Sequence, residues 1–109
     1  MVTSVKQYFD TLPDRFRRDA AKGVQAIFQF DLTGDGGGAY HVAVDGPTIA
    51  VGEGYHTAPT VTFKMAADDY LKLSNGKMNG HLAFATGKMK ISGNMMVAIK
   101  MQALFPPAK

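Results

Sequence analysis

The sequence predicts an α+β fold in which a five-stranded, largely antiparallel sheet is covered on one face by about five helices. Two observations lead to this prediction. Five short segments alternate apolar and polar residues, as strands with one buried face do. The segments around them carry apolar residues at helical spacing. The chain has 109 residues, the size of one domain, so we expect residues 1–109 to form a single domain.

The first part of the chain has a helical pattern. Apolar residues recur at positions i, i+3, i+4 and i+7, at Val5, Tyr8, Phe9 and Leu12. Thr3 or Ser4 is suited to cap the first turn, so we expect a helix over residues 3–12. Pro13 interrupts this helix. Because proline fits the first turn of a helix, we expect a second helical segment over residues 13–22.

Four strands are expected between residues 24 and 65. In the first, over residues 24–32, every even position is apolar: Val24, Ala26, Phe28, Phe30 and Leu32. The alternation recurs in residues 39–46, 48–54 and 60–65, which favours an antiparallel meander with one buried face. The glycine-rich segment 33–38 lacks the Gly-Lys-Ser/Thr ending of a phosphate loop and joins two strands, so we interpret it as a hairpin connection.

The last part of the chain returns to helical spacing and adds one strand. We expect a helix over residues 67–75 and a short helix over residues 79–86. Residues 88–92 alternate again and form the fifth expected strand. Asn94 is a good N-cap for a final helix that reaches about Phe105.

The final helix is apolar on two sides. At about 100° per residue, one stripe comprises Val97, Ala98, Met101, Leu104 and Phe105. A second stripe comprises Met95, Met96, Ile99 and Ala103. One stripe can pack on the domain, but the other needs an apolar partner, so the helix is buried, lines a cavity or faces a second subunit. Five of the 7 methionines lie between residues 78 and 101, and these adaptable side chains favour a pocket for varied apolar ligands.

The residue types that carry most enzyme chemistry form no motif here. The absence of cysteine excludes disulfides, thiolate nucleophiles and cysteine metal sites. His41, His56 and His81 lack the spacing of a metal site. Asp68 and Asp69 point about 100° apart on a helix, which suits helix initiation better than a shared proton. We therefore expect no catalytic residue, metal or cofactor, with a small lyase or hydrolase as a minor alternative.

The chain carries a net charge of +3, too small an excess to predict nucleic-acid binding. A basic cluster falls in the second helical segment, at Arg15, Arg17, Arg18 and Lys22. It is either a solvated face or a surface for weak, transient docking to anionic membrane lipids. No apolar run is long enough to span a membrane, and the N-terminus lacks the apolar stretch of a secretory signal. We expect a cytoplasmic protein.

The stretch before the final helix resembles a family signature. Residues 87–94 read Gly-Lys-Met-Lys-Ile-Ser-Gly-Asn. They are similar to the Gly-Lys-Leu-Lys-Ile-x-Gly-Asp of the sterol carrier protein family, also called non-specific lipid-transfer proteins, in its short stand-alone bacterial form. The similarity continues upstream through residues 30–37, 44–46, 69–70 and 75–78. Asn94 stands where the family usually has Asp, which keeps the helix cap but removes a charge.

The resemblance implies a domain whose helices and sheet enclose a hydrophobic tunnel for fatty acids, acyl-CoA, sterols or isoprenoid-like lipids, without catalytic residues. We expect inward-facing apolar side chains to line it: Phe28, Phe63, Leu71, Phe84, Met89, Ile91, Met95, Met96, Ile99 and Leu104. The expected function is intracellular binding and carriage of such lipids. The alternative is an accessory or scaffold subunit, for example in isoprenoid-quinone biosynthesis, with the final helix as a homodimer or partner interface.

Overall fold

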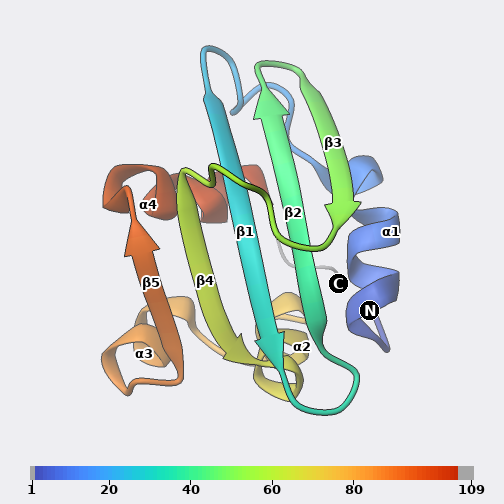
Figure 1. The fold of residues 1–109 in the computed structure, drawn as a ribbon, viewed down its shortest axis with the longest axis vertical. Coiled ribbons are helices and arrows are strands. Elements are labelled where there is room, and N and C mark those ends of the chain that lie inside the picture. Colours follow the sequence, from blue (N-terminus) through green and yellow to red (C-terminus); the bar gives the residue numbers. More distant parts are fainter. Residues whose placement is uncertain (1, 106–109) are drawn as a thin grey trace.

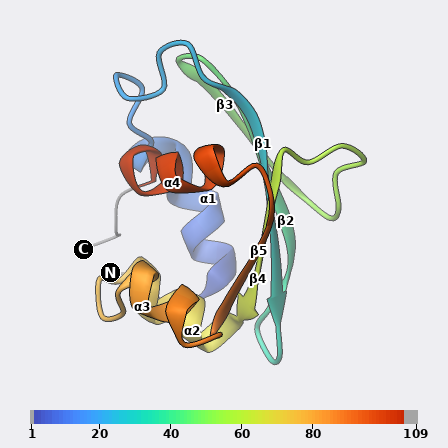
Figure 2. The same cartoon turned by 90° about the vertical axis from the view of Figure 1, so that its left-hand side faces the viewer.

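The strands form one sheet, and the helices pack on one of its faces (Figure 1). The computed structural model describes residues 2–105 and their side chains, except the side chain of Gln102. The strands are β1 (Gln25–Thr33), β2 (Gly38–Asp45), β3 (Thr48–Glu53), β4 (Val61–Ala66) and β5 (Met89–Gly93). The helices are α1 (Val5–Arg15), α2 (Ala67–Ser74), α3 (Gly80–Ala85) and α4 (Met95–Leu104). Figure 2 shows all of these helices on the same side of the sheet. The predicted α+β class is confirmed.

The strand order is β3-β2-β1-β4-β5, and one of the strand pairings is parallel. β1 pairs with β2, β2 with β3 and β4 with β5 in antiparallel fashion, whereas β4 lies parallel to β1 with Phe63 opposite Phe30. The predicted four-strand antiparallel meander is wrong at this point. Alternation of apolar residues shows which face of a strand is buried, but it does not identify the neighbouring strand.

A buried glutamine holds the segment that crosses from β3 to β4. This segment passes over the outer face of the sheet, opposite the helices (Figure 2). Gln29 on β1 is 2% exposed. Its Nε2 donates to the carbonyls of Tyr40 and Gly54, both at 3.1 Å, and its Oε1 accepts from the His56 N–H at 2.8 Å. Because a buried amide needs such partners, Gln29 fixes the start of the crossing segment on the sheet.

Helix α1 begins near the expected position and ends differently. The Gln7 N–H donates to Ser4 Oγ at 3.1 Å, so Ser4 is the cap, and Pro13 lies inside the helix. The second helical segment predicted over residues 13–22 is wrong, because the helix ends at Arg15 and turns follow. The structure therefore contains four helices between residues 2 and 105, where about five were expected.

Contacts with the end of α4 explain why α1 stops. Phe16 turns inward and is 5% exposed, with its ring centroid 6.0 Å from that of Phe105. The next N–H, from Arg17, donates to the Leu104 carbonyl at 3.0 Å. That bond replaces a further i→i−4 bond within the helix, so tertiary packing overrides the local pattern.

The basic cluster predicted on the second helical segment is divided in the structure. The Arg15 guanidinium lies over the Tyr8 ring at 4.8 Å, and that of Arg18 lies 5.8 Å from the centre of the Phe16 ring. Arg17 and Lys22 are exposed. The four residues therefore do not share one helical face.

The other predicted elements are confirmed, with ends that differ by one or two residues. Residues 33–38 connect β1 to β2, as expected for a hairpin. Asn94 caps α4, because its Oδ1 accepts from the N–H groups of Met96 and Val97 at 3.0 and 3.2 Å. The cap fixes where α4 starts and hence which of its faces meets the sheet.

Aromatic side chains fill the space between α1, α2 and the centre of the sheet. The Phe9 ring stacks on Tyr40 with centroids 4.3 Å apart and lies 5.2 Å from Phe30. Tyr70 of α2 lies 5.6 Å from Phe30 and 5.1 Å from Tyr8, edge-on in both cases. Offset stacked rings and edge-to-face pairs are the favoured aromatic geometries, and these contacts make this half of the domain a tightly packed core.

Candidate functional site

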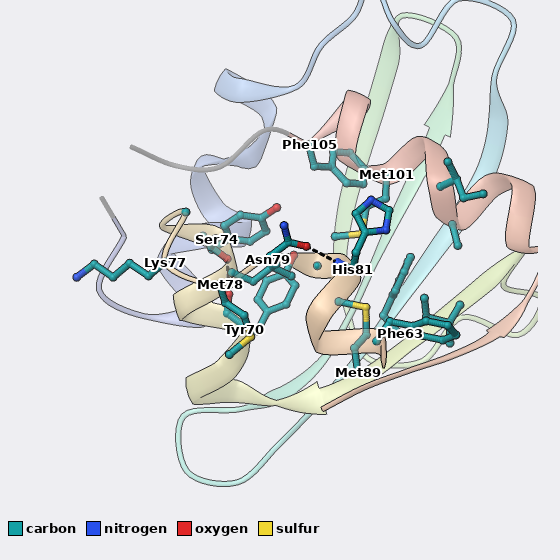
Figure 3. Close-up of a pocket in the computed structure, with 18 of the residues that line it drawn as sticks. Phe63, Tyr70, Ser74, Lys77, Met78, Asn79, His81, Met89, Met101 and Phe105 are labelled. Atoms are coloured by element: carbon teal, nitrogen blue, oxygen red, sulfur yellow. Dashed lines mark hydrogen bonds between the residues drawn. The ribbon is translucent and has the colours of Figure 1, made fainter. Parts of the chain in front are cut away.

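A cavity of about 780 Å³ lies against the β5 edge of the sheet, lined by residues of β4, β5 and the helices. Its walls come from α1, α2, the α2–α3 connection, α3, β4, β5, α4 and Phe105. The lining residues are Tyr8, Phe63, Tyr70, Leu73, Ser74, Gly76, Lys77, Met78, Asn79, Gly80, His81, Phe84, Met89, Ile91, Met95, Ala98, Ile99, Met101 and Phe105. Figure 3 draws 18 of these residues, and their side chains converge from different elements on one space.

The sheet supplies one wall of the cavity through the alternation of its strands. Phe63 on β4 and Ile91 on β5 are directly opposite each other in the ladder, and Met89 lies two residues before Ile91 on the same face. Their neighbours Lys64 and Lys90 are also paired and exposed. Because side chains alternate between the two faces, the apolar set lines the cavity and the lysines point to the outer face.

A glycine at the end of β5 allows α4 to cover this wall. Gly93 has φ +103°, a left-handed conformation that L side chains rarely adopt. An added Cβ at Gly93 would meet the Thr60 carbonyl oxygen at 2.6 Å. The next N–H, from Asn94, donates to that same carbonyl at 3.0 Å. The Gly-Asn pair of the signature stretch therefore turns the chain from the edge strand into the helix above the cavity.

Helix α4 divides its two apolar stripes as the sequence predicts. The first stripe packs on the domain: Ala98, Met101, Leu104 and Phe105 are buried and Val97 is half-buried. The second stripe is open to solvent, with Met95, Met96 and Ile99 at 44%, 71% and 68% exposure. Met95 and Ile99 also line the cavity, so the cavity reaches the surface along this helix.

Two tyrosines form the buried end of the cavity. Tyr70 is 1% exposed, and its buried hydroxyl makes no hydrogen bond of ordinary geometry with the described residues. Burial raises the pKa of Tyr70 well above its usual value, and the neighbouring Tyr8 hydroxyl adds to this rise. Burial likewise raises the pKa of Tyr8. Both phenols are therefore neutral donors at physiological pH.

The α2–α3 connection supplies the other polar groups. Asn79 caps α3 by accepting from the N–H groups of His81 and Leu82 at 2.8 and 3.3 Å. Lys77 lines the cavity with its stem, and its amino end extends away from it (Figure 3). The cavity is thus mainly apolar, with polar groups gathered at one side.

The structure places six of the ten predicted lining residues around the cavity. These are Phe63, Phe84, Met89, Ile91, Met95 and Ile99. The other four lie elsewhere. Phe28 and Leu104 are 0% and 1% exposed in the packed core, Leu71 is partly buried against that core, and Met96 points to solvent. A contribution of any of the ten to ligand binding remains a prediction.

Several lining residues were missed by the sequence-based prediction. Tyr8, Met101 and Phe105 belong to apolar faces of the first and last helices, and the structure places them where the core meets the cavity. Met78 belongs to the methionine-rich part of the chain, and this enrichment could have identified it as a lining residue. Nothing in the local sequence distinguished His81 as a cavity residue.

Two further features concern residues 2–105. No group of three or more His, Cys, Asp or Glu side chains there is placed to hold a metal ion. None of the helices formed by these residues is long and apolar enough to cross a membrane.

The fold and the cavity define a class of protein: a small α+β domain whose sheet and helices surround a mostly apolar space of ligand size. The chain belongs to the SCP-2 sterol transfer family, which matches residues 5–106. The resemblance identified from residues 87–94 is confirmed. The chain is also 37% identical over 103 residues to hydroxysteroid dehydrogenase-like protein 2 of Bos taurus. That match covers 93% of this chain and 24% of the relative, so the chain spans about a quarter of that protein's length.

Solved structures share the fold. The sterol carrier protein domain 2 of Helicoverpa armigera has a TM-score of 0.76 at 28% identity, over 91% of this chain and 83% of that one. The palmitated SCP2L2 of Aedes aegypti has a TM-score of 0.76 at 23% identity, over 93% of both chains. The UbiJ-SCP2 ubiquinone synthesis protein has a TM-score of 0.68 at 13% identity, over 90% of this chain and 89% of that one. The last two likenesses concern the fold alone.

Proposed function

We propose that this protein binds and carries hydrophobic lipids, such as fatty acids, acyl-CoA, sterols or isoprenoid-like molecules, within the cavity between α3, α4 and the sheet. The observation that carries the proposal is the cavity itself. Its volume of about 780 Å³ falls within the range of about 300–1,000 Å³ that small-molecule pockets occupy. The family match and the palmitated mosquito structure of the same fold support a lipid as the occupant.

The physical source of affinity is burial of the lipid tail. Each methylene group removed from water contributes about 0.8 kcal/mol, so a long acyl chain needs few polar contacts. Four methionines line the cavity: Met78, Met89, Met95 and Met101. Their unbranched, polarisable side chains adapt to chains of different shape, so we expect broad selectivity among lipids.

The proposed binding requires no chemistry by the protein. Ser74, Lys77, Asn79 and His81 are the polar side chains that line the cavity at the α2–α3 connection. No hydrogen bond among the described residues joins the His81 ring to Ser74 or to another nucleophile. A nucleophile–base pair would need such a contact or a water bridge, so we assign these groups to contact with the polar end of a ligand.

Native mass spectrometry of the gently purified protein tests the proposal, together with displacement of a fluorescent fatty acid. We expect a co-purified or added lipid at one molecule per chain. Ile91→Trp should fill the cavity and lower uptake about tenfold or more, because the new side chain takes the place of the tail. Ile49→Trp is the matched control, since Ile49 is also half-buried but lies on the opposite edge strand, β3. No bound lipid and no displacement would refute the proposal.

A second candidate is an accessory subunit that presents a lipid to an enzyme through the exposed stripe of α4. Two observations favour it: Met96 and Ile99 are more than two-thirds exposed, and a ubiquinone synthesis protein shares the fold. Sedimentation at several concentrations, and again after Ile99→Glu, distinguishes the two. If the protein is an accessory subunit, the wild-type chain assembles and Ile99→Glu abolishes that assembly. If it is a carrier, the wild-type chain is already a monomer and Ile99→Glu changes lipid uptake.

A further inference from the structure

The buried end of the cavity carries a hydroxyl group that the fold itself does not use. Tyr70 and Tyr8 are 1% and 2% exposed, and both line the cavity. The Tyr70 hydroxyl makes no hydrogen bond of ordinary geometry with the described residues. Because buried polar groups in folded proteins nearly always have a partner, each exception calls for an explanation.

The ring of Tyr70 is held by its neighbours, so its hydroxyl has a fixed position. The ring centroid lies 5.6 Å from that of Phe30 and 6.0 Å from that of Phe9. The Tyr8 ring meets it edge-on at 5.1 Å. A phenylalanine at position 70 would make the same ring contacts without burying an unpaired hydroxyl, which costs stability. Since a donor that is already fixed loses little freedom when a ligand binds, the hydroxyl is suited to ligand recognition.

The polar groups at this end of the cavity are uncharged. Burial raises the pKa of Tyr70 well above its usual value, and it also raises the pKa of Tyr8. Each phenol therefore keeps its proton and has one hydrogen bond to donate. Ser74, which follows Tyr70 by one turn of α2, also lines the cavity (Figure 3). Its hydroxyl donates to the Tyr70 carbonyl at 2.7 Å, so its oxygen is left to accept.

The basic side chains near the cavity are directed elsewhere. Lys77 lines the cavity with its stem, but its amino end extends away from it (Figure 3), and His81 is exposed. The Arg15 guanidinium lies over the Tyr8 ring, 4.8 Å from its centre, and donates to the Tyr8 carbonyl at 3.0 Å. Arg15 is not among the lining residues. A carboxylate at the buried end would therefore lose its hydration without an ion-pair partner in the lining, whereas an uncharged oxygen needs only hydrogen bonds.

We propose that the hydroxyls of Tyr70 and Tyr8 bind an uncharged oxygen, a hydroxyl or a carbonyl, at the polar end of the lipid. This end enters the cavity first, and the tail runs from the tyrosines toward Met95 and Ile99, where the cavity reaches the surface. The favoured ligands are therefore lipids that end in an alcohol or a ketone. The assignment rests on the proposed function as a lipid carrier and adds to it the polar group that is recognised.

A fatty-acid anion of the same length is held differently. Its carboxylate stays at the exposed side chains of Lys77 and His81, where water still reaches it. Removing a phenol hydroxyl should therefore weaken the binding of an alcohol and leave the binding of the anion almost unchanged. This difference separates recognition by the tyrosines from a general effect on the shape of the cavity.

Displacement of a fluorescent fatty acid by 1-dodecanol and by dodecanoate tests the assignment. Tyr70→Phe should lower the affinity for dodecanol about three- to tenfold, and Tyr8→Phe combined with it should lower that affinity further. The affinity for dodecanoate should change less than about twofold. Tyr40→Phe is the matched control, because Tyr40 is also buried, at 9% exposure, but does not line the cavity. Equal losses for the two ligands, or an unchanged affinity for dodecanol in the double variant, overturn the proposal.

Infrared spectroscopy shows whether the polar end reaches the tyrosines. A hydrogen bond weakens the C=O bond, so the labelled carbonyl of 2-dodecanone should absorb at lower frequency in the wild-type cavity than in hexane. The frequency should return toward the hexane value in the double variant of Tyr8 and Tyr70, and it should stay low in Tyr40→Phe. A carbonyl frequency that is the same in the wild type and the double variant overturns the proposal.

The outcomes distinguish this assignment from the carrier function on which it rests. If the wild-type chain binds none of the three ligands and no fluorescent fatty acid, the carrier function is refuted and the assignment falls with it. If all variants bind dodecanol as the wild type does, the carrier function stands and the tyrosine site is refuted. A Tyr70→Phe chain that is less stable without ligand and loses both dodecanol and dodecanoate equally would show a structural role and would also refute the site.

Discussion

Two halves of the same sheet face are covered in different ways. Under α1 and α2 the aromatic rings interlock, with Phe9 4.3 Å from Tyr40 and 5.2 Å from Phe30. Under α3 and α4 the sheet faces a cavity of about 780 Å³, and Phe84 and Ile99 on its margin are 47% and 68% exposed. One half is packed like a protein interior, and the other leaves room for a ligand.

The helices create this difference, because the strands are apolar in both halves. Helix α1 has 11 residues and buries Val5, Tyr8, Phe9 and Leu12, whereas α3 has 6 residues and buries only Ala83. Phe63 marks the boundary, since its ring stacks on Phe30 at 5.4 Å and also lines the cavity. The aromatic half therefore supplies stability, and the incompletely covered half leaves the space in which we propose that a lipid binds.

The largest expected effect is a difference between the two halves in how much a substitution lowers the free energy of unfolding. Phe30→Ala in the aromatic half should lower the free energy of unfolding by about 3–5 kcal/mol, because it leaves a cavity in a tightly packed core. Phe84→Ala on the cavity margin should change it by less than about 1 kcal/mol, because nearly half of that side chain already faces solvent. Urea unfolding of both variants measures the difference. Similar losses at the two sites would mean that the halves do not differ as described.

A bound lipid should stabilise the cavity half selectively. At a free ligand concentration of 100 times Kd, binding to the native state alone raises the free energy of unfolding by about 2.7 kcal/mol. Hydrogen exchange should then slow first at amides of α3, β5 and α4 that open locally, with little change in local opening of α1. Protection concentrated in β2 and β3, which contribute no residue to the cavity lining, would place the ligand elsewhere.

The smallest expected effect concerns the buried phenol between the halves. Tyr70→Phe removes a buried hydroxyl that makes no hydrogen bond of ordinary geometry with the described residues, and an unpaired buried polar group costs about 1–3 kcal/mol. The variant should therefore gain about 1 kcal/mol in thermal or urea unfolding. Tyr55→Phe is the control, because its hydroxyl donates to Asp31 at an exposed site. A loss of stability in Tyr70→Phe would show that the hydroxyl has a partner in solution.

Most elements of the fold could be predicted from the sequence because their signals are local. The even positions of residues 24–32 fixed the buried face of β1, and Asn94 marked the start of α4. The parallel pairing of β4 with β1 depends on Gln29 and a crossing segment 25 or more residues away. The end of α1 depends on contacts of Phe16 and Arg17 with α4. Such distant contacts leave no periodic signal in the chain.

For the candidate site, only the apolar faces of helices and strands were predictable from the sequence. The two stripes of α4 followed from helical spacing, and the exposed stripe lies where the cavity opens. Phe28 and Phe63 have the same alternation on the same sheet face, but only Phe63 reaches the cavity. The choice between core and cavity depends on how far the short helix α3 covers the sheet, which alternation does not encode.

The methionine methyl groups offer the most direct test of the central claim that the cavity holds a lipid. Labelled methyl resonances are followed by NMR as palmitate is added below its micelle concentration. The account predicts shifts for the cavity residues Met78, Met89, Met95 and Met101, with none for Met65, which is 3% exposed in the packed core. Unchanged cavity methyl groups, or shifts confined to the solvent-facing Met96, would contradict it.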